Sequence, residues 1–221
     1  MGASGYTGDV EVGGPADVRE LPGLTISKLA VSEMANNVYL LRDQDSGEAL
    51  LVDAAADPEA LRAFIGDADV RTVVTTHGHW DHHRALPEVV AATGAVTVAH
   101  PADADELPVP VQRPVVHGDT IRVGAQTLEV IHLRGHTPGS IALLWRGPEG
   151  ASTHLFTGDS LFPGGPGRTT TPEDFRSLMD DLEERIFGRL GDETWFYPGH
   201  GKDSTLGAER PHLDEWRARG W

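Results

Sequence analysis

The chain contains no cysteine in its 221 residues. Disulfide bonds, thiolate metal ligands and a cysteine nucleophile are therefore excluded, and a bound metal must be held by nitrogen and oxygen atoms, which suit zinc, iron or manganese. The sequence also lacks any run of about 18 consecutive apolar residues, and residues 1–5 carry no basic segment ahead of an apolar one. We therefore expect a cytoplasmic protein with no membrane partner.

Basic residues are scarce, because 18 Lys and Arg stand against 34 Asp and Glu and give a formal net charge of −16. Nucleic acids and anionic membranes select proteins with a net basic face, so neither is expected as a partner. A small-molecule substrate fits better, and a monomer and a homodimer both remain open. The hydrophobic content of 39% suffices for one well-filled domain, expected over residues 24–221. Residues 1–23, rich in Gly, Pro and acidic residues, are expected to form a flexible N-terminal lead-in.

Short apolar, β-branched runs alternate with helix starts along the whole chain. The predicted helices start after the N-cap residues Asp57 and Thr171, or occupy 82–93 and 208–219. The predicted strands are 24–31, 37–42, 49–53, 70–76, 95–99, 120–123, 127–132, 141–145, 153–157 and 194–197. Two strand-rich halves, each with helices, indicate an α/β (α+β) protein in which two packed sheets are flanked by helices.

The densest group of metal-binding residue types is His77-Gly78-His79-Trp80-Asp81-His82, directly after the apolar strand predicted at 70–76. In extended chain, His77 and His79 point to the same side, while Asp81 and His82 can fold back around a second position. One loop could therefore serve two metals. A polar surface loop that happens to contain histidine is the alternative, and the motif context argues against it.

Three later segments repeat the placement of a possible ligand just beyond a predicted strand: His136, Asp159 and His200. Each lies among Gly and Pro residues, which allow the tight turns that present a side chain at a sheet edge. Taken singly, each histidine could be structural and the aspartate could belong to a turn. Together with the first motif they indicate a metal site.

The segments His-x-His-x-Asp-His, Gly-His-Thr-Pro-Gly-Ser, Thr-Gly-Asp-Ser and Pro-Gly-His, in this order over residues 77 to 200, resemble the metallo-β-lactamase superfamily. The resemblance implies a four-layer αββα sandwich of two mixed β-sheets, with a dinuclear site at one edge. It implies that His77, His79 and His136 bind one metal, that Asp81, His82 and His200 bind the other, and that Asp159 bridges them. Asp53 matches the upstream aspartate of the superfamily and is expected to orient a ligand histidine; a strand-end cap is its alternative role.

The resemblance also indicates which branch of the superfamily this chain is most similar to. Thr-Gly-Asp-Ser has Asp159 where true metallo-β-lactamases usually have Cys or Ser. The match is nearer to hydroxyacylglutathione hydrolases (glyoxalase II), lactonases and persulfide dioxygenases. In the first of these a C-terminal helical region holds glutathione, whereas this chain ends 21 residues after His200, which argues against a glutathione thioester as the substrate.

The functional hypothesis is a metallo-hydrolase of a small ester, thioester or lactone, in which hydroxide bound to two divalent metals, with zinc the leading candidate, attacks the carbonyl carbon. Asp81 and Asp159 are the catalytic candidates, because they hold the metals and can shuttle a proton. The alternative is a mononuclear iron persulfide dioxygenase-like oxidoreductase, since 164–169 is similar to the Gly-Arg-Thr segment of that branch. A non-enzymatic metal-binding protein is the third reading.

Other polar residues are predicted to have no part in the chemistry. The run 103–106 is expected to be a solvated loop. Trp80 could line a substrate pocket or pack beneath its loop, and His83 could support the ligands. Packing or surface roles are expected for five further histidines, and a solvated face for three C-terminal arginines: His100, His117, His132, His154, His212, Arg210, Arg217 and Arg219.

Overall fold

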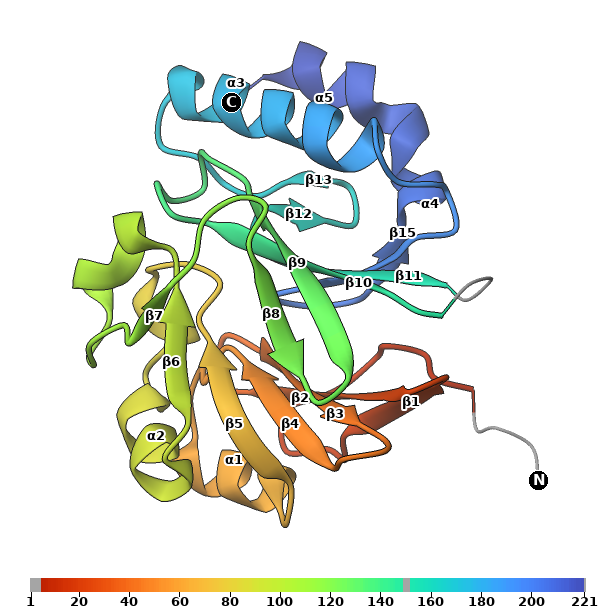
Figure 1. Ribbon diagram of the computed structural model, residues 1–221. Helices are drawn as coiled ribbons and strands as arrows, with labels where there is room; N and C mark the ends of the chain where they lie inside the picture. The colour runs from red at the N-terminus through yellow and green to blue at the C-terminus, as the bar shows by residue number, and fades with distance from the viewer. Residues whose placement is uncertain (1–4, 149–151, 221) are drawn as a thin grey trace.

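The computed structural model describes residues 5–148 and 152–220. Two β-sheets pack face to face, and helices cover the outer face of each, so the predicted four-layer αββα sandwich is confirmed (Figure 1). No helix among the described residues is long and apolar enough to cross a membrane.

The first sheet has seven strands in sequence order, with antiparallel pairing up to β4 and parallel pairing from β4 to β7. Two α-helices follow β4 and β5 and pack on the outer face of this sheet (Figure 1). The elements of this half are β1 (Asp17–Leu21), β2 (Leu24–Val31), β3 (Asn36–Asp43), β4 (Glu48–Val52), α1 (Pro58–Ile65), β5 (Asp69–Val74), the 3-10 turn η1 (Trp80–His82), α2 (Leu86–Thr93), β6 (Val96–Ala99), the 3-10 turn η2 (Pro101–Glu106) and β7 (Arg113–Pro114).

The second sheet has six strands in the order β15-β14-β11-β10-β9-β8, and β11 and β14 run parallel. Helices α3 and α5 lie over its outer face, with the β12-β13 hairpin nearby (Figure 1). The elements are β8 (Thr120–Val123), β9 (Gln126–His132), β10 (Ile141–Arg146), β11 (Thr153–Gly158), β12 (Leu161–Phe162), β13 (Gly165–Pro166), α3 (Pro172–Asp181), the π-helical turn η3 (Leu182–Phe187), β14 (Trp195–Pro198), β15 (Ser204–Thr205), α4 (Leu206–Glu209), the 3-10 turn η4 (Arg210–His212) and α5 (Leu213–Arg219).

Three apolar layers hold the sandwich together. The central layer lies between the sheets and includes the fully buried rings of Trp145, Phe156 and Tyr197. Each fully buried large apolar side chain contributes roughly 1.5–3 kcal/mol. The other two layers join each sheet to its helices. The site-bearing loops are therefore anchored on rigid strands.

Most of the predicted strands agree with the structure within one or two residues, but the start of the first sheet was wrong. Strand β1 (Asp17–Leu21) pairs antiparallel with β2, although the sequence prediction began the ordered chain at Leu24. Its burial alternates only between half-buried and exposed positions, because β1 is an edge strand. This weak apolar signal is the reason that the sequence prediction missed it.

Helix α2 begins at Leu86 and not at the predicted His82. The amides of Arg84 and Ala85 donate to the carbonyl oxygens of Ala55 and Ala54, each at 3.0 Å, and therefore cannot form helical bonds. These hydrogen bonds hold the loop before α2 against the segment that follows β4. His82 lies instead in the 3-10 turn, with its ring fully buried.

Two predicted helix ends also need correction. Asp57 has a left-handed backbone with φ of 53° and makes no side-chain cap; its Oδ2 accepts a hydrogen bond from the amide of Ser32. The terminal helix is broken into α4, η4 and α5, with a proline inside η4. Thr171, in contrast, caps α3 as predicted, because its Oγ1 accepts a hydrogen bond from the amide of Asp174.

Candidate metal centre

The seven predicted ligands lie together on loops that follow β5, β9, β11 and β14. Because β11 and β14 are parallel, the loops after them leave the same edge of the second sheet, and a β-bridge between Asn36 and His200 joins that edge to the first sheet. The ligands form three overlapping groups, in each of which the ligand atoms lie within 4.8 Å of one another: His77, His79 and His136; His77, His82 and Asp159; Asp81, His82 and His200.

The first group consists of three histidines whose rings pack edge to face. The ring centroids of His79 and His136 are 4.5 Å apart, and those of His77 and His79 are 4.9 Å apart. The Nε2 atoms of His77 and His136 are buried and have no hydrogen-bond partner. Buried polar atoms are normally paired, so two unpaired Nε2 atoms in one group fit a bound cation.

Four of the histidines are held through Nδ1. His82 Nδ1 lies 2.9 Å from Asp53 Oδ2, and His136 Nδ1 lies 2.7 Å from the carbonyl oxygen of Arg168. His200 Nδ1 lies 3.0 Å from the carbonyl oxygen of Met34, and His77 Nδ1 lies 3.0 Å from Thr76 Oγ1. Each of these oxygens can accept a hydrogen bond from Nδ1–H, which places the ring proton on Nδ1 and leaves the Nε2 lone pair for a metal.

The ligand atoms of Asp81, His82 and His200 also lie close together. The Nε2 atoms of His82 and His200 are only 3.2 Å apart, and each lies close to Asp81 Oδ2, at 3.5 and 3.4 Å. The amide Nδ2 of Asn36 donates to the same Asp81 oxygen at 2.8 Å. Two imidazole lone pairs and a carboxylate oxygen around one point are a suitable donor set for a divalent cation.

Asp159 lies between the two sets of histidines. Its Oδ1 is 3.5 Å from His82 Nε2, and its Oδ2 is 3.8 Å from His136 Nε2 and 3.5 Å from His200 Nε2. Oδ1 is buried and has no hydrogen-bond partner. This position between both sets is the one that a bridging carboxylate needs.

The surroundings lower the pKa values of His77, His136 and both aspartates, whereas contacts with the aspartates raise the pKa values of two histidines, His82 and His200. Burial, reinforced by His82 and His136, holds the pKa of His77 well below its usual value. Burial opposes ionisation of Asp159, but the close approach and charge of His82 lower its pKa. Burial also opposes the charged form of His82, yet the nearby carboxylates of Asp159 and Asp53 raise its pKa to about 10. A metal must displace that proton from His82.

Asp53 holds this histidine as the sequence analysis expected. It is buried, with 2% of its surface exposed, and Oδ1 accepts from the amide of Thr76 at 2.7 Å. Oδ2 accepts from Thr76 Oγ1 at 2.8 Å and pairs with His82 Nδ1. The carboxylate therefore fixes the β5 loop and the ring orientation of His82 together.

Two residues of the site were missed from the sequence. Asn36 was predicted to lie just before a strand and nothing marked it as a partner of Asp81, which is 45 positions away. Asp103 was assigned to a solvated loop, and this was wrong: it is only 3% exposed and accepts three hydrogen bonds from the ligand loops. Asp103 belongs to the acidic run 103–106, and such runs are usually exposed to solvent, so nothing in the sequence indicated that this residue is buried.

The structure also shows where the residues expected to lie outside the chemistry are found. Trp80 does not pack beneath its loop, because it is 55% exposed and Arg84 lies over its ring. His83 is buried and its Nε2 lies 3.2 Å from the carbonyl oxygen of Gly78 in the ligand loop. Packing roles hold for His154, which is buried against Tyr197, and for the stacked pair His100 and His132. On the exposed side, His117 and His212 face solvent, while Arg210 and Arg217 form ion pairs with acidic neighbours.

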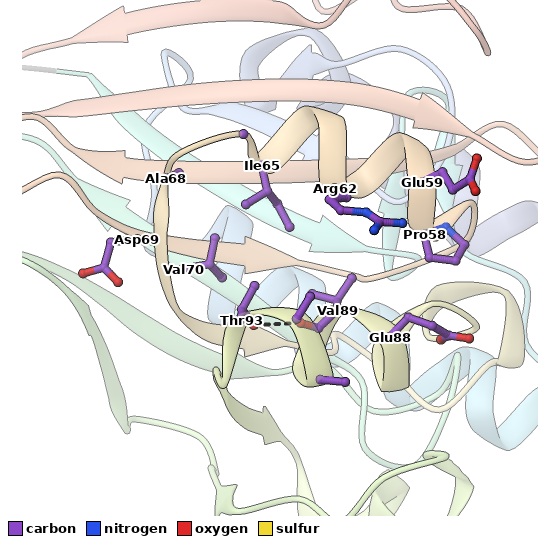
Figure 2. A pocket seen from close by; sticks show the side chains of 13 residues that line it. Pro58, Glu59, Arg62, Ile65, Ala68, Asp69, Val70, Glu88, Val89 and Thr93 are labelled. Atoms are coloured by element: carbon purple, nitrogen blue, oxygen red, sulfur yellow. Dashed lines mark hydrogen bonds between the residues drawn. The ribbon is translucent and has the colours of Figure 1, made fainter.

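A cavity of about 460 Å³ lies beside the metal ligands, lined by residues 166–170, Phe175, Arg219 and Gly220. Gly167 joins the cavity to the centre, because a Cβ there would collide with the backbone oxygen of Asp159 and lie 3.4 Å from His136 Nδ1. A larger cavity of about 830 Å³ lies between α1 and α2 and contains none of the seven ligands (Figure 2). None of the seven predicted ligands lines the smaller cavity either, but its wall residue Arg168 contacts His136 Nδ1 through its carbonyl oxygen, so this is the cavity that adjoins the centre.

Comparisons with known proteins agree with this geometry. Residues 31–200 match the family model of the metallo-beta-lactamase superfamily. The chain is 37% identical over 168 residues to a hydroxyacylglutathione hydrolase of Fuscovulum blasticum, covering 75% of this chain and 62% of that protein. The chain thus spans less than two thirds of the length of that relative.

Two solved structures are similar along most of their length. ETHE1 from Myxococcus xanthus has a TM-score of 0.73 and 29% identity, over 87% of this chain and 84% of that one. A crystal structure in a di-iron-bound form has a TM-score of 0.67 and 29% identity, over 83% of this chain and 96% of that one. With the matched motifs, the fold and these similarities in agreement, the chain belongs to the metallo-beta-lactamase superfamily.

Proposed function

We propose that this protein is a metal-dependent hydrolase that cleaves a small thioester, ester or lactone, with a hydroxyacylated thiol as the leading substrate class. The observation that carries the proposal is the convergence of the Nε2 atoms of four histidines, each held through Nδ1, on two aspartates. No thiolate ligand and no cysteine nucleophile exist in the chain. The chemistry therefore depends on oxygen and nitrogen ligands.

Divalent metals held there would supply Lewis acidity and would lower the pKa of a bound water toward neutrality. His77, His79 and His136 would hold one metal, and Asp81, His82 and His200 the other, with Asp159 between them. Asp159 Oδ1 has no hydrogen-bond partner and would accept and return a proton at the centre. Asn36 holds Asp81 Oδ2 by donating a hydrogen bond, which keeps that carboxylate directed at the site.

The cavity beside the centre supports an acidic tail on the substrate. Arg168 and Arg219 line it, and neither guanidinium forms an ion pair with any residue in the described ranges. In a chain of net charge −16, two such cations beside one cavity favour a carboxylate on the leaving group. The similarity to hydroxyacylglutathione hydrolases supports the same substrate class, because the leaving thiol of such a substrate carries carboxylates.

The test uses freshly purified protein, its metal content by mass spectrometry, and three substrates: S-lactoylglutathione, an uncharged thioester and a γ-lactone. We expect two metals per chain, and turnover that a chelator abolishes and added metal restores. Arg219→Gln should raise KM for the anionic thioester and leave KM for the uncharged thioester unchanged. A protein without bound metal, or without metal-dependent hydrolysis of any of the three, contradicts the proposal.

A second candidate function is oxidation of a persulfide with iron at the centre. The similarity to ETHE1 and the Gly167-Arg168-Thr169 segment support keeping it. Oxygen consumption with glutathione persulfide distinguishes the two candidates. One iron per chain together with oxygen uptake favours the oxygenase, whereas thioester cleavage without oxygen uptake favours the hydrolase.

A further inference from the structure

A buried carboxylate outside the predicted ligand set connects the two loops that carry the three-histidine group. Asp103 lies in the 3-10 turn η2, which follows β6, and only 3% of its surface is exposed. We propose that Asp103 is a positioning residue: it fixes the His77–His79 loop against the His136 loop and so sets the metal affinity of that group. The inference rests on the metal-binding role proposed above.

The contacts of Asp103 reach both loops. Oδ2 accepts from the amide of Gly78 at 2.8 Å, and Gly78 separates His77 from His79. The same oxygen accepts from Thr137 Oγ1 at 2.5 Å, and Thr137 directly follows His136. Oδ1 accepts from the amide of Gly139 at 2.7 Å. One side chain thus ties together backbone segments that lie about 60 positions apart in the sequence.

Both loops approach Asp103 through a glycine, and there is little room for a side chain at either position. A Cβ at Gly139 would lie 2.6 Å from the Asp103 Cγ, and a Cβ at Gly78 would lie 3.2 Å from the Asp103 Cβ. The loops therefore pack directly on Asp103, and a shift of its side chain would move them. Because a metal accepts only a narrow range of ligand distances, small movements between the two loops reduce affinity.

Only a carboxylate satisfies all of these donors. The three groups that face Asp103 are two amide N–H groups and a hydroxyl, and an ionised carboxylate has acceptor oxygens alone. Thr137 Oγ1 also lies 2.6 Å from Ser140 Oγ, which can donate to it while Thr137 donates to Asp103. An asparagine at position 103 would place an NH2 group against at least one N–H donor.

Loss of the Asp103 hydrogen bonds should affect mainly the three-histidine group. Within the described part of the chain, no hydrogen bond of Asp103 reaches the loops of Asp159 or His200, and His82 is held separately by Asp53. Loss of the Asp103 bonds should therefore weaken the three-histidine group more than the group of Asp81, His82 and His200. A residue that served only general stability would weaken both groups alike.

The test compares Asp103→Asn with Asp105→Asn, which removes the same charge from an exposed residue of the same turn. Stepwise affinities for Zn²⁺ are measured by competition with a chromophoric chelator, and Co²⁺ absorption spectra report ligand geometry. The binding step that is lost in His136→Ala identifies the three-histidine group. Thermal unfolding of the metal-free variants measures general stability.

We expect Asp103→Asn to weaken that step by about 10- to 100-fold, to change the Co²⁺ spectrum, and to leave the other step within about threefold. Asp105→Asn should match the wild type. Equal weakening of both steps, or no change in either, overturns the inference. Should Asp103→Asn fail to fold, Thr137→Ser and Thr137→Val replace it: the hydroxyl of serine should retain the affinity and valine should lose it, and equal affinities overturn the inference. A wild-type chain that binds no metal overturns the proposed function itself, whereas two wild-type steps unaffected by the substitution overturn only the role of Asp103.

Discussion

Replacing Asp53 by asparagine should weaken the metal site that contains His82. The substitution preserves the shape of the side chain, and asparagine tolerates the left-handed backbone at this position, where φ is 58°. It removes a negative charge and one acceptor from a residue that is 98% buried, since its exposed fraction is 2%. The backbone should therefore stay in place while the hydrogen bonds change.

Both orientations of the new amide are unfavourable. If its oxygen accepts from the Thr76 amide, its NH2 faces His82 Nδ1 and favours the tautomer that carries its proton on Nε2, where the metal must bind. If the amide is reversed, its NH2 faces the Thr76 N–H and leaves a buried donor unpaired, which costs about 1–3 kcal/mol. Substituting a residue that orients a metal ligand typically reduces metal affinity by about 10- to 100-fold, or about 1.4–2.8 kcal/mol.

The assay is competition with a chromophoric chelator at fixed pH and ionic strength. Asp69→Asn is the matched control, because it removes the same charge from an exposed side chain whose partner is Arg71. We expect one of two binding steps to weaken in Asp53→Asn, and neither to weaken in the control. Wild-type affinity for both metals in Asp53→Asn would refute the reasoning that this carboxylate fixes the tautomer of His82.

Three further outcomes follow from the structure. Lys28→Met leaves the fully buried carboxylate of Asp203 without its ammonium partner at 2.6 Å, so the free energy of unfolding in urea should fall by about 3–5 kcal/mol, and Lys202→Met, on the exposed surface, should change it little. Hydrogen bonds from Ser46 lower the pKa of Asp43 to about 2; this carboxylate therefore stabilises the fold above its unfolded pKa of about 3.9, and the stabilisation is lost as the pH falls through about 2. Asp43→Asn should accordingly flatten the acid dependence of stability between about pH 4 and 2, and an unchanged slope would contradict this. A Cβ at Gly199 would collide with Asp159 Oδ1, so Gly199→Ala should reduce the metal content measured by mass spectrometry, whereas Gly201→Ala, which meets no atom within 4 Å, should retain it apart from backbone strain.

The sequence predicted the fold class because its strands are short, apolar and bounded by clear turns. Strand β2 (Leu24–Val31) has the bounds that were predicted, and β10 and β11 differ from their predictions by one residue each. The edge strand β1 was missed because none of its positions is fully buried. Local pattern therefore identifies strands that have a buried face and fails for those at an edge.

The sequence by itself also determined which residue types gather at the site. The nitrogen and oxygen ligands stand at fixed positions in short motifs, so they can be recognised without knowledge of the rest of the chain. Only the tertiary structure decided how they are held. The partners Asn36 and Asp81 are 45 positions apart, and Asp103 and Thr137 are 34 positions apart. Such contacts exist only after the two sheets have packed and brought the ligand loops together, so no local pattern distinguishes the buried carboxylate of Asp103 from the exposed one of Asp105.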